Sequence, residues 1–266
     1  MNSMPHLPRE TMTALRSKTL SFRAIPNKRQ VLSAVSLAGL VGLPGCSAVT
    51  GNPVVSLIRI VDASSNSNGI DVYQGSGALA YNLGLGTITT YVPVTPGTYN
   101  INVDAAGGKT QLATVLGSFG PNAQYTVVVG DNSTVLGETV LKDQSVPAPS
   151  GQVALRFIHQ SSAGGAVDIY LIPNGSTISQ VKPILTGVTF GTNTGYLNEP
   201  AGTYTLAAVP TGTVPSATTA TSYSGNAVVY GSGTAKTIVL INQPLLTTPG
   251  IQVVMADDFD PATATS

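Results

Sequence analysis

The sequence has very little charge and very little sulfur. Asp, Glu, Lys and Arg together make up 9% of its 266 residues, and Cys46 is its one cysteine. A single cysteine excludes an internal disulfide, so any folded domain must be stable without one. With two histidines and one cysteine, the chain has too few ligands for a zinc or copper site. No phosphate-binding loop or dinucleotide fingerprint is present either. We therefore expect no metal and no cofactor.

Basic residues are scarce in all but the first part of the chain. Six of the twelve Lys and Arg residues precede residue 30, where Glu10 is the only acid. The remainder carries an excess of acids over bases. A domain without a basic patch lacks the electrostatic footprint of a nucleic-acid-binding protein. We therefore expect no nucleic-acid partner.

What is abundant is glycine, proline and small or β-branched residues. The chain contains 29 Gly and 18 Pro, and 42% of its residues are hydrophobic. No Gly-X-Y period is present, which excludes collagen, and the hydrophobic content is sufficient for a packed core. This composition is typical of short strands joined by turns.

The sequence is duplicated internally. Residues 57–73 read LIRIVDASSNSNGIDVY and residues 154–170 read ALRFIHQSSAGGAVDIY, and each copy later reaches a Gly-Thr-Tyr step, at Gly97 and Gly202. The spacing of the copies matches the size of a usual domain. We therefore predict two repeats, at residues 54–144 and 152–258, joined by a Pro-containing linker at 145–151 and followed by a tail at 259–266.

Each repeat alternates apolar and polar residues in the manner of β-strands. In the first, Ile58 and Ile60 share one face, while Leu57, Arg59 and Val61 share the other. Further strands are expected at 125–129, 135–141, 237–241 and 251–255, and a Thr- and Ser-rich insertion at 210–224 is expected to be an exposed loop. Six or seven short strands per copy predict an all-β protein of two tandem antiparallel β-sandwiches.

The N-terminal region has the pattern of an export signal. A basic segment is followed by an uncharged run at residues 31–43, which is too short to span a membrane. Leu43-Pro44-Gly45-Cys46 then resembles the lipobox of bacterial lipoproteins. This resemblance implies a signal peptide at 1–45, acylation of Cys46 by fatty acids such as palmitate, and a tether at 46–53. With Ser47 after the cysteine, it implies the outer membrane if the host has two membranes.

The duplicated segment repeats a trio of functional side chains. If the strands around residues 57–62 and 70–73 formed a hairpin, Arg59 would lie opposite Asp71, with Tyr73 on the same face. The second copy would place Arg156, Asp168 and Tyr170 in the same way. One interpretation is a structural ion pair beside an aromatic ring. The other is a polar recognition patch present on both repeats.

Catalytic groups are sparse. Ser161, His159 and Asp168 contain the residue types of a nucleophile set, but His159 and Asp168 would point to opposite faces of the hairpin, and no Gly-x-Ser-x-Gly elbow is present. The acidic residues Asp257, Asp258 and Asp260 match no calcium loop and are expected to be a solvated end. No catalytic residue is therefore expected.

The duplicated motif also resembles a known family. The strand with Arg, the small-residue loop, Val-Asp-Ile-Tyr at 167–170 and Pro-Ala-Gly-Thr-Tyr at 200–204 are similar to domain-of-unknown-function family 4397 (DUF4397), over most of residues 54–258. His159 matches a histidine common in that family, where the first copy has Asp62. The resemblance implies immunoglobulin-like or transthyretin-like sandwiches and an envelope location. It implies no activity.

These observations favour a non-enzymatic envelope lipoprotein. It would bind the membrane through lipidated Cys46 and display two β-sandwiches to an envelope protein, a glycan or matrix. The alternative is a ligand carrier or sensor that uses the duplicated Arg, Asp and Tyr face. A third hypothesis, a hydrolase that uses His159, is weaker because the first repeat lacks the histidine.

Overall fold

The computed structural model describes residues 54–132, 135–216, 218–243 and 250–261. The predicted signal peptide, Cys46 and the tether lie outside the described residues. Within the described part, the structure contains no helix long and apolar enough to cross a membrane.

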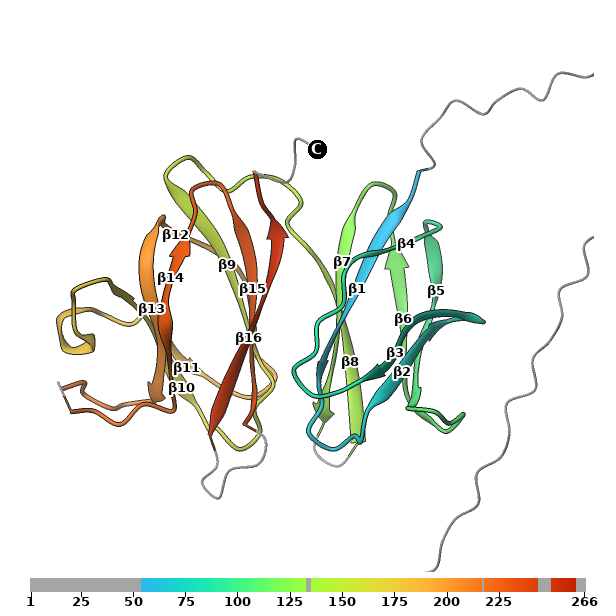
Figure 1. The fold of residues 1–266 in the computed structure, drawn as a ribbon, viewed down its shortest axis with the longest axis horizontal. Coiled ribbons are helices and arrows are strands. Elements are labelled where there is room, and N and C mark those ends of the chain that lie inside the picture. The colour runs from blue at the N-terminus through green and yellow to red at the C-terminus, as the bar shows by residue number, and fades with distance from the viewer. Residues whose placement is uncertain (1–53, 133–134, 217, 244–249, 262–266) are drawn as a thin grey trace, which may run out of the picture. The chain divides into compact units, whose positions relative to one another are not determined.

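Each repeat is a sandwich of two four-stranded sheets (Figure 1). In the first repeat the strands are β1 (Ser56–Ala63), β2 (Ile70–Gln74), β3 (Gly77–Leu83), β4 (Val92–Val94), β5 (Gly97–Ala105), β6 (Gln111–Phe119), β7 (Gln124–Asn132) and β8 (Val135–Lys142). In the second they are β9 (Gln152–His159), β10 (Val167–Pro173), β11 (Leu185–Val188), β12 (Asn193–Pro200), β13 (Gly202–Pro210), β14 (Tyr223–Tyr230), β15 (Ala235–Asn242) and β16 (Ile251–Phe259), with a short 3-10 helix, η1 (Ile178–Gln180).

The two repeats have the same topology. We call the sheets β4-β1-β7-β8 and β12-β9-β15-β16 the junction sheets, and the sheets β3-β2-β5-β6 and β11-β10-β13-β14 the outer sheets. Adding eight to every strand number of the first repeat gives the strand orders of the second. The prediction of two tandem β-sandwiches is confirmed. Each repeat has eight strands rather than six or seven, and each junction sheet contains one parallel pair, β1 with β7 and β9 with β15.

The predicted alternation of β1 is present in the structure. Ile58 and Ile60 enter the core of the first sandwich, whereas Val61 enters a separate apolar cluster on the opposite face. Both faces of β1 are buried. The second sandwich has a corresponding core, which includes Phe157 and Ile169.

The predicted hairpin is wrong. β1 pairs with β4 and β7, whereas β2 pairs with β3 and β5, so the loop at 64–69 crosses from one sheet of the sandwich to the other. Arg59 and Asp71 consequently lie in different layers. The same holds for Arg156 on β9 and Asp168 on β10. Alternation identifies the faces of a strand but not its neighbours.

The expectation for the acidic C-terminal residues is also wrong at one position. β16 extends to Phe259, and Asp258 is only 4% exposed. By contrast, Asp257 has an exposed side chain. Asp258 is therefore part of the folded second sandwich rather than a solvated end.

Candidate functional site

Arg59 is the centre of a buried cluster that joins the two repeats. Its Nε donates to Thr126 Oγ1 at 2.9 Å, and its Nη1 donates to the Asp257 carbonyl oxygen at 2.8 Å. Its Nη2 forms an ion pair with the Asp258 carboxylate. The guanidinium also lies over the ring of Tyr91, 4.9 Å from the ring centroid. Arg59 therefore contacts Thr126 and Tyr91 of its own repeat on one side and strand β16 of the second repeat on the other.

Arg156 repeats this arrangement in the opposite direction. Its Nε donates to Thr237 Oγ1 at 3.0 Å, its Nη1 donates to the Lys142 carbonyl oxygen at 3.2 Å, and its Nη2 bonds to Asp143 Oδ1 at 2.5 Å. Its guanidinium lies over the ring of Tyr196, with 4.8 Å to the centroid. We call the two halves together the reciprocal clamp, because each repeat supplies an arginine to the other repeat's aspartate.

Each aspartate of the clamp is held in place by its own repeat. Asp143 Oδ2 accepts hydrogen bonds from Tyr91 Oη and Thr126 Oγ1, both at 2.7 Å. Asp258 Oδ2 accepts the same pair of bonds from Tyr196 Oη and Thr237 Oγ1, also at 2.7 Å. A buried carboxylate is stable only when its lone pairs have partners. Here the hydroxyls satisfy one oxygen and the arginine satisfies the other.

The electrostatics of the cluster favour a charged arginine. Burial alone lowers the pKa of Arg59, but the nearby Asp258, Tyr91 and Asp143 outweigh it, and the pKa is raised. Burial raises the pKa of Asp258, an effect that Arg59 opposes. Burial likewise raises the pKa of Tyr91 and of Tyr196 far above the usual range, so both phenols stay protonated and act as donors. Arg59 therefore helps to keep the buried carboxylate of Asp258 ionised.

An apolar cluster lies beside the clamp and crosses the same junction. It contains buried residues of both junction sheets, with Val61 and Val128 from the first repeat and Ile158, Val239 and Ile241 from the second. The junction thus combines apolar burial with two buried ion pairs. This combination excludes water from both repeats' outward-facing arginines.

Asp71 and Asp168 have a different role from the arginines. Asp71 accepts the backbone N–H groups of Asn82 at 2.7 Å and Gly107 at 3.0 Å. Asp168 accepts the backbone N–H of Gly187 at 2.8 Å and the hydroxyl of Thr211 at 3.0 Å. Both aspartates therefore fix the loops at one end of the outer sheets.

His159 also fixes a loop. Its Nδ1 accepts the Ser161 N–H at 3.2 Å, so its Nε2 carries the proton and donates to the Gly165 carbonyl oxygen at 2.9 Å. In the first repeat, Asp62 accepts the Ser64 N–H in the same way. Burial lowers the pKa of His159. Both ring nitrogens are occupied, so the neutral imidazole acts as a structural group in the loop.

The third residue of the trio differs between the repeats. Tyr170 is buried against Ala207 and Val209 of β13, beneath Ile178 and Val181 of the segment after β10. Tyr73 instead borders an open hollow on the outer sheet of the first repeat. Burial and, after it, the Asp71 carboxylate raise the pKa of Tyr73, and burial and Asp168 do the same for Tyr170. The aspartate and the tyrosine of each trio therefore stay close together on the outer sheet, whereas the arginine lies at the junction.

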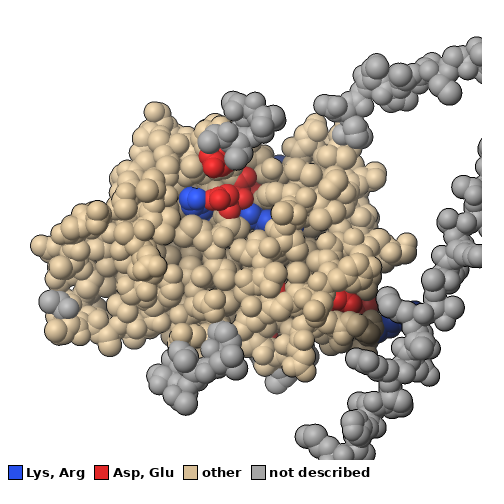
Figure 2. Space-filling view, viewed as in Figure 1, with Lys and Arg blue, Asp and Glu red and all other residues tan. Residues whose placement is uncertain are grey.

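Most members of the clamp do not follow from the sequence patterns, namely Tyr91, Thr126, Asp143, Tyr196, Thr237 and Asp258. A signal for some of them was present. In each repeat a tyrosine lies six residues before the Gly-Thr-Tyr step, Tyr91 before Gly97 and Tyr196 before Gly202. Each repeat also has an aspartate at or just beyond the end of its last strand. Figure 2 shows that most of the visible surface is uncharged, so the few charged residues stand out. Among the described residues, no group of three or more His, Cys, Asp or Glu is placed to hold a metal ion.

Comparison with known proteins places part of the chain in a family. The segment from Ser56 to Tyr170 matches the model named "Domain of unknown function (DUF4397)". Residues 56–170 are a DUF4397 domain. This DUF4397 domain begins with β1 and ends within β10, so it contains both arginines of the clamp. No curated protein matches the chain.

A solved structure shows a distant similarity. It is the crystal structure of CBMbc (family CBM26) from Eubacterium rectale Amy13K in complex with maltoheptaose, at 11% sequence identity and a TM-score of 0.23. The match covers 77% of this chain and 98% of that one. A TM-score this low supports no conclusion about a ligand of the DUF4397 domain or of the second repeat.

Proposed function

We propose that this protein is a non-enzymatic lipoprotein of the cell envelope that displays two β-sandwiches as one rigid binding unit. The observation that carries the proposal is the reciprocal clamp. Two buried arginines and two buried aspartates tie the repeats to each other, and none of these four groups is exposed to solvent. Such a junction restricts motion between the repeats and holds their outer sheets in a fixed relative orientation.

The use of the polar residues supports a binding role over a catalytic one. Arg59, Arg156, Asp71 and Asp168 are all occupied by protein partners, and His159 uses both ring nitrogens in its own loop. A catalytic base needs a free nitrogen or oxygen within reach of a substrate. The partner proposed here is instead a protein, glycan or matrix component of the envelope.

The anchoring part of the proposal rests on the sequence around Cys46. Labelling with a radioactive fatty acid should mark the wild-type protein and leave the Cys46→Ala variant unmarked. Fractionation should then move the variant from membrane to soluble fractions. Label on the variant, or an unlabelled wild type, would contradict lipid anchoring at this residue.

The display part is tested by capture. Full-length protein immobilised on beads should retain a specific component of solubilised envelope fractions, and it should release no product from ester, peptide or glycoside substrates. His159→Ala serves as the control for hydrolysis. Turnover by the wild type that this variant abolishes would replace the binding proposal with a hydrolase.

A further inference from the structure

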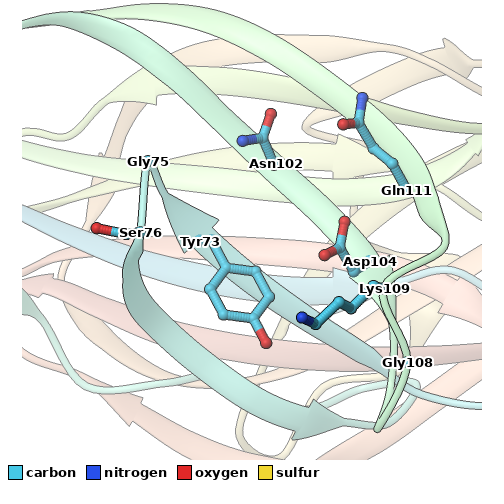
Figure 3. Close-up of a pocket in the computed structure, with 8 residues that line it drawn as sticks. All are labelled: Tyr73, Gly75, Ser76, Asn102, Asp104, Gly108, Lys109 and Gln111. Carbon is cyan, nitrogen blue, oxygen red and sulfur yellow. The ribbon is translucent and has the colours of Figure 1, made fainter.

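The outer sheet of the first repeat carries an open polar hollow of about 500 Å³. It is lined by Tyr73 of β2, Asn102 and Asp104 of β5, Lys109 of the turn between β5 and β6, and Gln111 at the start of β6, together with residues 75, 76 and 108. Figure 3 shows the side chains of Tyr73, Asp104 and Lys109 around a common space. The site therefore combines one aromatic ring with amide, carboxylate and ammonium groups.

The second repeat shows that the fold does not require these polar residues. Tyr73 pairs with Asn102 across the sheet, and its counterpart Tyr170 pairs with Ala207. Asp71 pairs with Asp104, and Asp168 pairs with Val209. In the second repeat the apolar side chains are covered by Ile178 and Val181. The same face is thus open and polar in one copy but closed and apolar in the other.

Several polar groups of the hollow have no partner in the protein. The side chains of Asp104, Lys109 and Gln111 make no hydrogen bond or ion pair with any described residue, whereas Asn102 Oδ1 accepts one bond from Thr114 at 2.8 Å. Their combined donors and acceptors are free to bind another molecule. Asp104 and Lys109 carry opposite charges, so the lining has no net charge.

An exposed aromatic extends the hollow. Tyr81 of β3 is 65% exposed, and its ring packs edge-on against the ring of Tyr73, with 5.8 Å between centroids. Tyrosine combines an apolar ring with a polar hydroxyl and is enriched at binding surfaces for that reason. Because the hollow lacks an apolar pocket, it does not suit a hydrophobic peptide side chain.

We propose that this hollow binds an uncharged oligosaccharide. The C–H face of a sugar ring would pack on the aromatic rings of Tyr73 and Tyr81, and its hydroxyls would bond to Asn102, Asp104, Lys109 and Gln111. A sugar hydroxyl both donates and accepts, so it matches a lining that contains both kinds of group. The inference rests on the proposed binding function and specifies its ligand class and its site.

The test uses purified full-length protein and soluble neutral hexasaccharides of glucose (α- and β-linked), mannose, xylose and N-acetylglucosamine. Binding to at least one hexasaccharide is expected, measured by isothermal titration. Lys109→Ala, Gln111→Ala and Tyr81→Ala should each weaken it about ten-fold, the loss expected for one hydrogen bond or one stacking contact. These three side chains are exposed, and unchanged melting temperatures would show that the variants fold.

The matched controls lie in the second repeat. Lys182→Ala and Phe190→Ala remove an exposed lysine and an exposed aromatic that do not line the hollow, and they should leave binding unchanged. The inference is overturned if no hexasaccharide binds, if the hollow variants bind like the wild type, or if only polygalacturonate or a peptide binds. If the hollow variants still capture an envelope component but no hexasaccharide binds, the proposed binding function stands and only the oligosaccharide site is wrong.

Discussion

Removing one arginine of the clamp should destabilise both repeats together. In Arg59→Met, the Asp258 carboxylate would stay buried without its ion-pair partner, and it would keep only the two hydroxyl donors on Oδ2. Breaking a buried ion pair costs about 3–5 kcal/mol. Because those hydroxyls remain and Asp258 can take up a proton, we expect about 3 kcal/mol at pH 7.

The neighbouring ion pair provides a matched control. Lys236 pairs with Asp257, one residue from Asp258, but the side chain of Asp257 is 62% exposed. An exposed pair contributes about 0–1 kcal/mol, so Lys236→Met should have little effect. Urea unfolding followed by circular dichroism measures both variants.

A double-mutant cycle separates the ion pair from other losses. Asp258→Asn removes the charge that Arg59→Met leaves unpaired, so the double variant should be less destabilised than the sum of the single variants, by about 1–3 kcal/mol. Arg156→Met with Asp143→Asn should give a smaller coupling, because Asp143 also lies 3.8 Å from Arg59, which remains as a second partner when Arg156 is lost. An Arg59→Met cost below about 1 kcal/mol, or additive single effects, would show that the buried ion pair does not stabilise the junction.

Three further predictions concern single positions in the first repeat. Both carboxylate oxygens of Glu138 are buried without a hydrogen-bond partner, and burial raises the pKa of Glu138 to about 7. Between about pH 4.5 and 7 the folded state therefore binds more protons than the unfolded state. The protein should lose stability as the pH rises through that window. After allowance for its partial exposure, Glu138→Gln should stabilise the protein by about 1–2 kcal/mol at pH 8 and have little effect at pH 4 in urea unfolding; equal effects at both values would contradict the shift. A methyl group at Gly117 would lie 2.5 Å from the ring of Phe119, so Gly117→Ala should cost about 1–3 kcal/mol, and an unchanged melting temperature would count against this packing. Asp71→Ala removes the acceptor for two backbone N–H groups, so hydrogen exchange at Asn82 and Gly107 should accelerate, and unchanged protection there would show that the loops do not depend on this side chain.

The faces of the strands could be predicted from the sequence, but the strand neighbours could not. Alternation correctly separated Ile58 and Ile60 from Arg59 and Val61. It gave no information on whether the loop at 64–69 closes a hairpin or crosses between sheets. Both are compatible with a period of two. The hairpin prediction therefore failed although the strand prediction held.

The partners of the arginines lie beyond the reach of local patterns. Arg59 and Asp258 are separated by 199 positions, and their contact depends on how two complete sandwiches pack. Asp258 also stands in an acidic run that is typical of a solvated end. Duplication was the more informative signal, since both repeats build their half of the clamp from the same residue types.

We expect the clamp to hold the two repeats as one rigid unit. Replacing Cys46 with Ser removes the chain's one native thiol, and spin labels on cysteines at Leu116 and Val229 then report the distance between the outer sheets, because both positions are exposed. Double electron–electron resonance should give one narrow distance distribution for this protein and a broad one when Arg59→Met and Arg156→Met are added. A broad distribution with both arginines present would show that the clamp does not hold the repeats rigidly.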